Sequence, residues 1–183
     1  MSEDTTYQKR YKALLEKLKK SDNWAEPLPE VIEFFGETRR FVVVESPFAA
    51  DTAAEIEENL TYARLDCHDA LVRFGEIPFA SHIKYTQDGI LDDTVPWERS
   101  LGIAAGLAEG LLAQKTAVYV DRGFSTGMLK GIEAALKAGR KVELRTLKNW
   151  DENPIETLAA AKVELVNAMG ALADDVEMLY QRG

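Results

Sequence analysis

Short apolar runs alternate with longer segments of helical periodicity along the middle of this chain. The apolar runs are rich in β-branched residues and predict buried strands over residues 41–44, 77–80, 116–120 and 141–145. The periodic segments between them predict helices over residues 51–74, 96–112 and 126–138. Helices that alternate with short apolar strands are typical of an α/β fold. We therefore expect a three-layer sandwich with a mainly parallel sheet, as in flavodoxin-like and Rossmann-like proteins.

Helical periodicity also marks both ends of the chain. Tyrosines and leucines recur at helical spacing within residues 3–20, and a further helical turn is expected over residues 30–35. Pro154 begins a last predicted helix, which runs to about Tyr180. We expect three parts: a helical arm over residues 1–39, an α/β core over residues 40–147, and a C-terminal helix over residues 148–183 that packs on the core or forms an oligomer interface.

Composition and charge exclude several classes of protein. The net charge of −9 argues against general binding of nucleic acid or anionic membranes, and 46% hydrophobic residues argue against wholesale disorder. The single cysteine, Cys67, excludes an intrachain disulfide and a cysteine-based zinc site, and two histidines are too few for a His-rich metal site. The charged N-terminus does not resemble a signal peptide, and no run of about 18 apolar residues is present. We expect a cytoplasmic protein without a metal or cofactor.

In an open parallel sheet, ligands bind beyond the carboxyl ends of the strands. The first predicted strand is followed there by Glu45, Ser46, Pro47 and Phe48. A glutamate in this place is either a ligand or base, or the partner of an arginine. The second strand leads into a long polar segment, residues 81–96, which can bind a sugar or base through His82, Tyr85, Gln87, Asp92 and Asp93. The alternative is a solvated loop in which Asp92 or Asp93 caps the next helix.

The third strand is followed by a turn that opens a helix. Free N–H groups at a helix N-terminus favour an anion, so Ser125 and Gly127 form a candidate anion site, with Arg122 as a positive charge and Gly123 and Gly127 permitting close approach of the backbone. The alternative is that Ser125 caps its own helix and holds no ligand. Other residues are interpreted as packing residues, namely Cys67, Trp24, Trp97 and Trp150, and His68 as a packing or surface residue.

Three stretches of this sequence resemble nucleoside 2-deoxyribosyltransferase-like domains of bacteria and phages. They are VVESPFAADTAAEIEENLTYAR, IPFASHIKYTQDGILDDTVPWERSLGIAAGL and AVYVDRGFSTGMLKGIEAALKAGRKVELR, which together cover about residues 41–147. The shared features are a Ser-Pro-Phe turn, an Asn-x-x-x-Ala-Arg helix, a Ser-His-x-x-Tyr-Thr-Gln loop and a Ser-x-Gly-Met turn. Such domains cleave or transfer the N-glycosidic bond of nucleosides or nucleoside monophosphates.

The resemblance implies a site and also a departure from it. A carboxylate near C1′ stabilises or attacks the oxocarbenium ion, an acid assists the leaving base, and phosphate sits at the Ser-x-Gly turn, here with Ser125, Gly127 and Met128. The family's glutamate follows that serine by six residues, where this chain has Gly131. The carboxylate must therefore come from elsewhere or be absent. The candidates are Asp121, which comes first, and Glu98, Glu45, Asp92 and Asp93.

Three interpretations remain open on the sequence. The first is an N-glycosidase or deoxyribosyltransferase-like enzyme, in which Ser46, Ser125 and Gly127 hold sugar or phosphate and His82 and Tyr85 contact base or ribose. The second, favoured by Gly131, is a protein that binds a nucleotide-derived ligand without turnover. The third is an assembly protein whose terminal helices mediate oligomerisation. We expect a small nucleoside or nucleotide ligand and a homo-oligomer.

Overall fold

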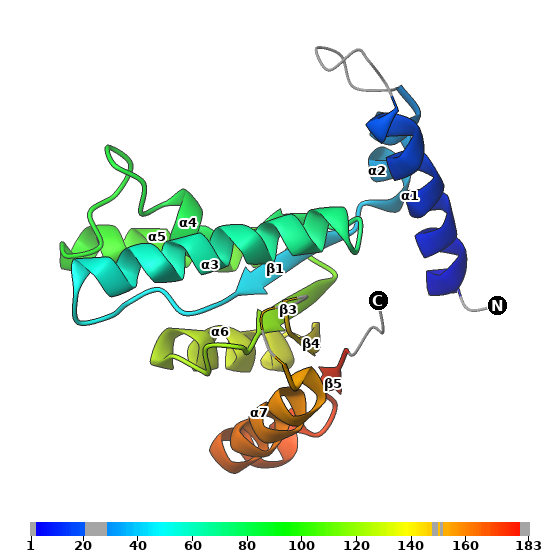
Figure 1. Cartoon of the computed structure of the whole chain (residues 1–183). Coiled ribbons are helices and arrows are strands. Elements are labelled where there is room, and N and C mark those ends of the chain that lie inside the picture. The colour runs from blue at the N-terminus through cyan, green and yellow to red at the C-terminus, as the bar shows by residue number, and fades with distance from the viewer. Residues whose placement is uncertain (1–2, 21–28, 148–149, 151, 180–183) are drawn as a thin grey trace.

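The computed structural model describes residues 3–20, 29–147, 150 and 152–179. Its centre is a parallel sheet of five strands in the order β2-β1-β3-β4-β5. The strands are β1 (Phe41–Glu45), β2 (Ile77–Phe79), β3 (Lys115–Tyr119), β4 (Lys141–Arg145) and β5 (Glu177–Met178). Helices flank this sheet (Figure 1), so the predicted three-layer α/β sandwich is confirmed.

Each face of the sheet has its own core. On one face, α3 (Ala53–Val72) buries Val42, Val44 and Tyr119. On the other, α6 (Thr126–Lys137) and α7 (Pro154–Met169) bury a larger apolar cluster that includes Ile132 and Leu165. The helix α5 (Pro96–Gly110) contacts β2 and the short helix α4 (Ser81–Lys84). Strands covered on both sides explain why the central runs are apolar throughout.

The strand order places a topological switch between β1 and β3. The chain leaves β1 for β2 on one side, then crosses to β3 on the other side, where Glu45 lies opposite Val118. The loops after β1 and β3 therefore diverge, which opens space above the carboxyl edge of the sheet.

The structure differs from the sequence prediction at the C-terminal end. The last helix does not reach about residue 180: α7 ends at Met169, where Gly170 takes φ 58°, and a 3₁₀ turn, Gly170–Ala173, follows. The chain then adds β5, a strand that sequence reasoning missed because it has only two residues and both are exposed. The apolar face of α7, including Leu158 and Leu165, is buried in the core.

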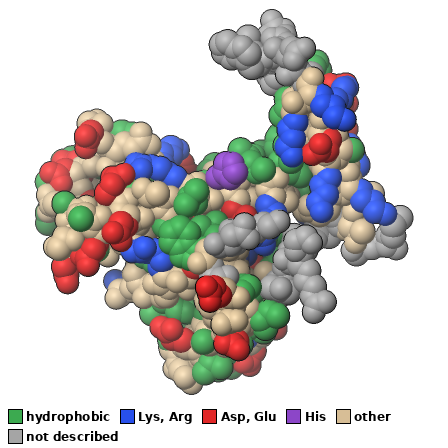
Figure 2. Space-filling model, in the orientation of Figure 1, with side chains coloured by type: hydrophobic (Ala, Val, Ile, Leu, Met, Phe, Trp, Pro, Cys, Tyr) green, Lys and Arg blue, Asp and Glu red, His purple; other side chains and the backbone are tan. Residues whose placement is uncertain are grey.

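Two helices at the N-terminal end form a hairpin that projects from the end of α3 (Figure 1). These are α1 (Glu3–Lys19) and α2 (Pro29–Thr38), the latter longer than the predicted turn because Gly36 does not interrupt it. The Tyr11 hydroxyl donates to the carbonyl of Leu71 at 2.6 Å, which anchors the hairpin to α3. Figure 2 shows basic side chains gathered on this hairpin, while acidic ones are spread over the lobe that carries α3.

Candidate functional site

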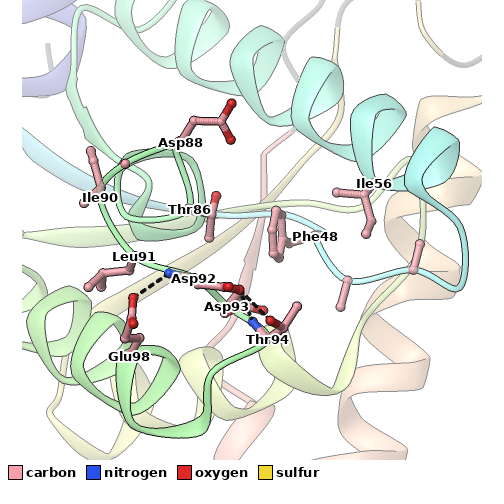
Figure 3. Close-up of a pocket in the computed structure, with 13 residues that line it drawn as sticks. Phe48, Ile56, Thr86, Asp88, Ile90, Leu91, Asp92, Asp93, Thr94 and Glu98 are labelled. Carbon is pink, nitrogen blue, oxygen red and sulfur yellow. Dashed lines mark hydrogen bonds between the residues drawn. The ribbon is translucent and has the colours of Figure 1, made fainter.

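A pocket of about 900 Å³ lies beyond β1, between the loop that leads into α3 and the segment between α4 and α5. Phe48 of the loop and Ile56 of α3 contribute apolar surface on one side, and Thr86 and Leu91 line the pocket from the segment between α4 and α5 (Figure 3). Its volume matches that of pockets that enclose small molecules. The polar segment over residues 81–96 therefore forms a wall of a pocket, where the sequence left open a plain solvated loop.

All titratable side chains that line this pocket are acidic: Asp88, Asp92, Asp93 and Glu98. Asp92 Oδ1 accepts hydrogen bonds from the Thr94 hydroxyl at 2.6 Å and from its N–H at 2.9 Å, and these bonds lower the pKa of Asp92 below its usual range. Glu98 Oε2 accepts the Asp92 N–H at 2.7 Å (Figure 3). Asp93 pairs with Arg99. The α5 N-cap is Val95, so neither aspartate caps this helix.

The charge of the pocket determines which ligands suit it. Carboxylates accept hydrogen bonds from hydroxyl and amine groups and stabilise positive charge, whereas they repel phosphate. No group of three or more histidine, cysteine, aspartate or glutamate side chains is arranged to hold a metal ion within the described residues. The pocket therefore suits a neutral, hydroxyl-rich or partly cationic molecule with an apolar face that packs on Phe48.

Ser46 and His82 form a partly buried polar pair next to Phe48, whose ring lies 6.4 Å from that of His82. Ser46 Oγ lies 3.0 Å from His82 Nε2, and burial lowers the pKa of His82 to about 4, so the ring is neutral at neutral pH. Asp66 of α3 is fully buried, and neither of its carboxyl oxygens has a hydrogen-bond partner among the described residues. Burial raises its pKa to about 9, although the nearby Ser46 hydroxyl acts in the opposite direction. Asp66 is thus a protonated acid at neutral pH.

Asp121, the first sequence candidate for a catalytic acid, has a structural role. Its Oδ2 accepts the Tyr62 hydroxyl at 2.7 Å and the Leu147 N–H at 3.0 Å, which joins the ends of β3 and β4 to α3. Nearby, Asn59 of α3 joins two loops: it donates to the Phe48 carbonyl at 3.0 Å and accepts from Arg122 Nε at 3.0 Å. Arg122 also lies 3.4 Å from Glu58. The guanidinium group that was expected to attract a phosphate therefore contacts two side chains of α3.

The start of α6 matches the alternative interpretation of Ser125. Its hydroxyl accepts the Met128 N–H at 3.2 Å and so caps the helix. Met128 is 1% exposed and belongs to the core, a position that keeps its side chain from a ligand at the surface. Gly123 takes φ 73° in the preceding turn, and a Cβ at Gly127 would have room, with its nearest neighbour at 3.8 Å.

Glu45 lies against Gly131, the position at which the domains that this sequence resembles carry a glutamate. A Cβ placed on Gly131 would lie 2.1 Å from Glu45 Oε1 and 2.7 Å from its Cδ. The carboxyl group of β1 thus fills the space that a side chain from α6 would enter. Burial raises the pKa of Glu45 to about 8, with Arg140 acting in the opposite direction. Glu45 is not among the residues that line the pocket.

Other sequence candidates lie apart from the pocket. Tyr85 donates to Glu109 of α5 at 3.0 Å, Gln87 is exposed, and Pro47 is buried. Trp97 does not pack as expected, since it is 65% exposed, and Trp150 is 44% exposed although its ring lies 5.1 Å from that of Tyr62. Trp24 lies outside the described residues.

Sequence reasoning missed the polar character of the buried face of α3. The apolar spacing predicted that Ile56, Leu60, Ala63, Cys67 and Leu71 share one inward face, yet Leu71 is 40% exposed. The buried stripe is rotated around the helix and contains Asn59, Tyr62, Ala63, Asp66, Asp69 and Ala70. The signal in the sequence was the Asn-x-x-x-Ala-Arg spacing, which puts Asn59 and Ala63 on one side of a helix.

A comparison with known protein families finds a match over the part of the chain that carries the pocket. The family model described as Domain of unknown function (DUF7768) matches residues 40–145, from the residue before β1 to the end of β4. The chain belongs to this family. No curated protein and no solved structure matches the chain. The DUF7768 region includes the pocket, the Ser46–His82 pair and the Glu45–Gly131 contact, whereas α1, α2, α7 and β5 lie outside it. Within the described residues, no helix is long and apolar enough to cross a bilayer.

Proposed function

We propose that this protein binds a nucleoside in the acidic pocket and cleaves or transfers its N-glycosidic bond. The observation that carries the proposal is the pocket itself, a hollow of about 900 Å³ at the carboxyl edge of the sheet that combines apolar side chains with exclusively acidic titratable groups. Departure of a base builds positive charge at C1′ of the sugar, and nearby carboxylates stabilise this charge. The motifs shared with nucleoside 2-deoxyribosyltransferase-like domains support the same chemistry.

Asp92 and Glu98 are the proposed carboxylates at the reacting centre. Both line the pocket, and the hydrogen bond from the Asp92 N–H to Glu98 fixes one relative to the other. The lowered pKa of Asp92 keeps it ionised at neutral pH, as stabilisation of a cation requires. Phe48 offers an apolar surface to the base or the sugar ring. Because the lining is acidic, we expect nucleosides to bind better than their 5′-monophosphates.

The test is incubation of the protein with a panel of ribo- and deoxynucleosides and their monophosphates, followed by chromatography of the free base. We expect base release from at least one nucleoside, reduced about 100-fold or more by Asp92→Asn or Glu98→Gln. Glu133→Gln is the matched control, because Glu133 pairs with Lys137 on the outer surface of α6. Equal loss in all three variants would contradict the assignment.

A second candidate function is binding of the same ligand class without turnover. It is favoured by Gly131, which removes the carboxylate that the resemblance places on α6, and by Glu45, which does not line the pocket. A nucleoside that raises the melting temperature but releases no base would support this function. Absence of both base release and a thermal shift across the panel would overturn both candidates. Tighter binding of monophosphates, lost in Ser125→Ala, would move the ligand site to the start of α6.

A further inference from the structure

The outward face of α5 is apolar and exposed, and no described part of the chain covers it. Along this face, Trp97 is 65% exposed, Leu101 53%, Leu107 49% and Leu111 80%. Ile103 at 54% and Leu112 at 64% are also exposed, but they lie on either side of this face, and Leu112 follows the end of the helix. Single exposed leucines are common on protein surfaces, whereas Trp97, Leu101 and Leu107 of the helix and Leu111 at its C-cap form a continuous patch.

The helix packs inward through its smallest residues. A Cβ on Gly106 would lie 2.6 Å from Cβ of Ser81 on α4, and a Cβ on Gly110 would lie 2.8 Å from Arg140 Nη1. A Cβ on Gly102 would meet Leu91 at 3.2 Å. A helix on the surface of a monomer normally turns its large apolar side chains inward. The reversed arrangement of α5 indicates that its outward face is buried against another molecule.

The pattern on this face is the same in both directions along the helix. Ala104 is its centre: leucines lie three residues before and after it, at Leu101 and Leu107, and Trp97 and Leu111 lie seven residues before and after it. At 100° per residue, all five point to within about 60° of one direction. A second α5 that runs antiparallel therefore meets the first with large side chains at the ends and alanine in the middle. Such self-complementarity is what a two-fold interface requires.

The exposed area is in the range that a stable dimer needs. With roughly 150–250 Å² per large side chain, Trp97, Leu101, Leu107 and Leu111 together expose on the order of 500 Å² of apolar surface. A homodimer interface of standard size buries about 800 Å² per partner, of which about 65% is apolar. The alternative of an anionic membrane is disfavoured, because the chain carries a net charge of −9 and α5 has Arg99 as its only basic residue, already paired with Asp93.

From these observations we infer that α5 is the interface of a symmetric homodimer, in which two copies of the helix pack antiparallel with the two-fold axis near Ala104. This interface does not depend on the proposed function, because the inward side of α5 faces α4 and the pocket and its outward side faces the second copy.

The first test is the mass of the full chain by light scattering after gel filtration at tens of micromolar. We expect about 41 kDa, twice the 20.4 kDa of one chain. The double variant Leu101→Glu with Leu107→Glu should give the monomer mass with unchanged helical circular dichroism, because it places four carboxylates at the centre of the interface. Val163→Glu on α7 is the matched control, since Val163 is 61% exposed, and should remain dimeric.

The second test is a cross-link that reports the two-fold axis. In a Cys67→Ala background, Ala104→Cys should form a disulfide-linked dimer under mild oxidation much faster than Val163→Cys. A monomeric native chain would overturn the inference, as would a dimer that persists in the double glutamate variant or equal cross-linking at both positions. Binding of a monomeric native chain to neutral lipid vesicles, lost in the double variant, would assign the face to a membrane instead.

Discussion

Glu45 on β1 and Gly131 on α6 share one small volume. A Cβ at position 131 would lie 2.1 Å from Glu45 Oε1, so any residue other than glycine requires the Glu45 carboxyl group to move. The carboxyl group of the strand thus occupies the space beside the helix that a side chain at position 131 would need. Glu45 is half-buried, and desolvation raises its pKa to about 8.

We predict that the effect of Gly131→Ala on stability changes sign with the residue at position 45. In the native chain the substitution should lower the free energy of unfolding by about 1–3 kcal/mol, because a methyl group enters occupied space. In a Glu45→Ala background it should raise that free energy by up to about 1 kcal/mol, because alanine favours a helix over glycine. Urea unfolding of the four proteins measures both effects, and equal effects in the two backgrounds would exclude the contact.

At the scale of elements, α3 organises the carboxyl edge of the sheet. Its buried polar side chains replace the apolar stripe expected of a helix on a sheet, because the loops after β1 and β3 pass beneath it. Asn59 satisfies the Phe48 carbonyl and the Arg122 guanidinium with one amide group. The wall of the pocket that carries Phe48 is therefore held by α3.

Asn59→Ala should make the pocket segment that carries Phe48 less ordered. We expect a loss of about 2–3 kcal/mol in unfolding free energy, since two hydrogen bonds are lost, one of them with a charged donor. We also expect faster hydrogen exchange in the segments that carry Phe48 and Arg122, measured by mass spectrometry. Asn167→Ala on the exposed side of α7 is the control and should change neither quantity. A loss of stability with unchanged exchange in both segments would contradict a local role.

At the scale of the whole molecule, acidic side chains whose pKa values are shifted in opposite directions determine how stability depends on pH. Burial raises the pKa of Asp66 to about 9 and that of Glu45 to about 8. Their stabilising protonated forms are complete at low pH and are lost as pH rises toward those values. Burial alone would also raise the pKa of Glu143, but Arg145 and Lys115 beside it lower that pKa to about 2, so its contribution is lost as pH falls from about 4.5 toward 2.

We therefore predict maximal stability near pH 4–5, below the range usual for proteins. Between pH 5 and 8 the free energy of unfolding should fall, with a limiting slope of about 1.4 kcal/mol per pH unit for each buried acid. The double variant Asp66→Asn with Glu45→Gln should flatten this decline, which denaturant titrations at several pH values can measure. A native chain that gains stability from pH 5 to 8 would contradict the prediction.

The sequence by itself determined the α/β class, four strands of the sheet and the helices α3, α5 and α6 between them, but not the short helix α4. These follow from periodicity within short segments, which each segment carries whatever its neighbours do. It also located the polar segment over residues 81–96, because a polar stretch of this length is unusual between two elements of a compact domain. It did not reveal β5, since two exposed residues have no periodicity to detect.

Only the tertiary structure decided which polar side chains meet. Asp121 and Arg122 were expected to face a ligand but are held by Tyr62 and Asn59 of α3, and the burial of Asp66 depends on the rotation of that helix. The same holds for α5, whose glycines pack closely against neighbouring side chains while its large apolar residues are exposed. Such contacts depend on the relative placement of segments far apart in the chain, and local periodicity carries no information about that placement.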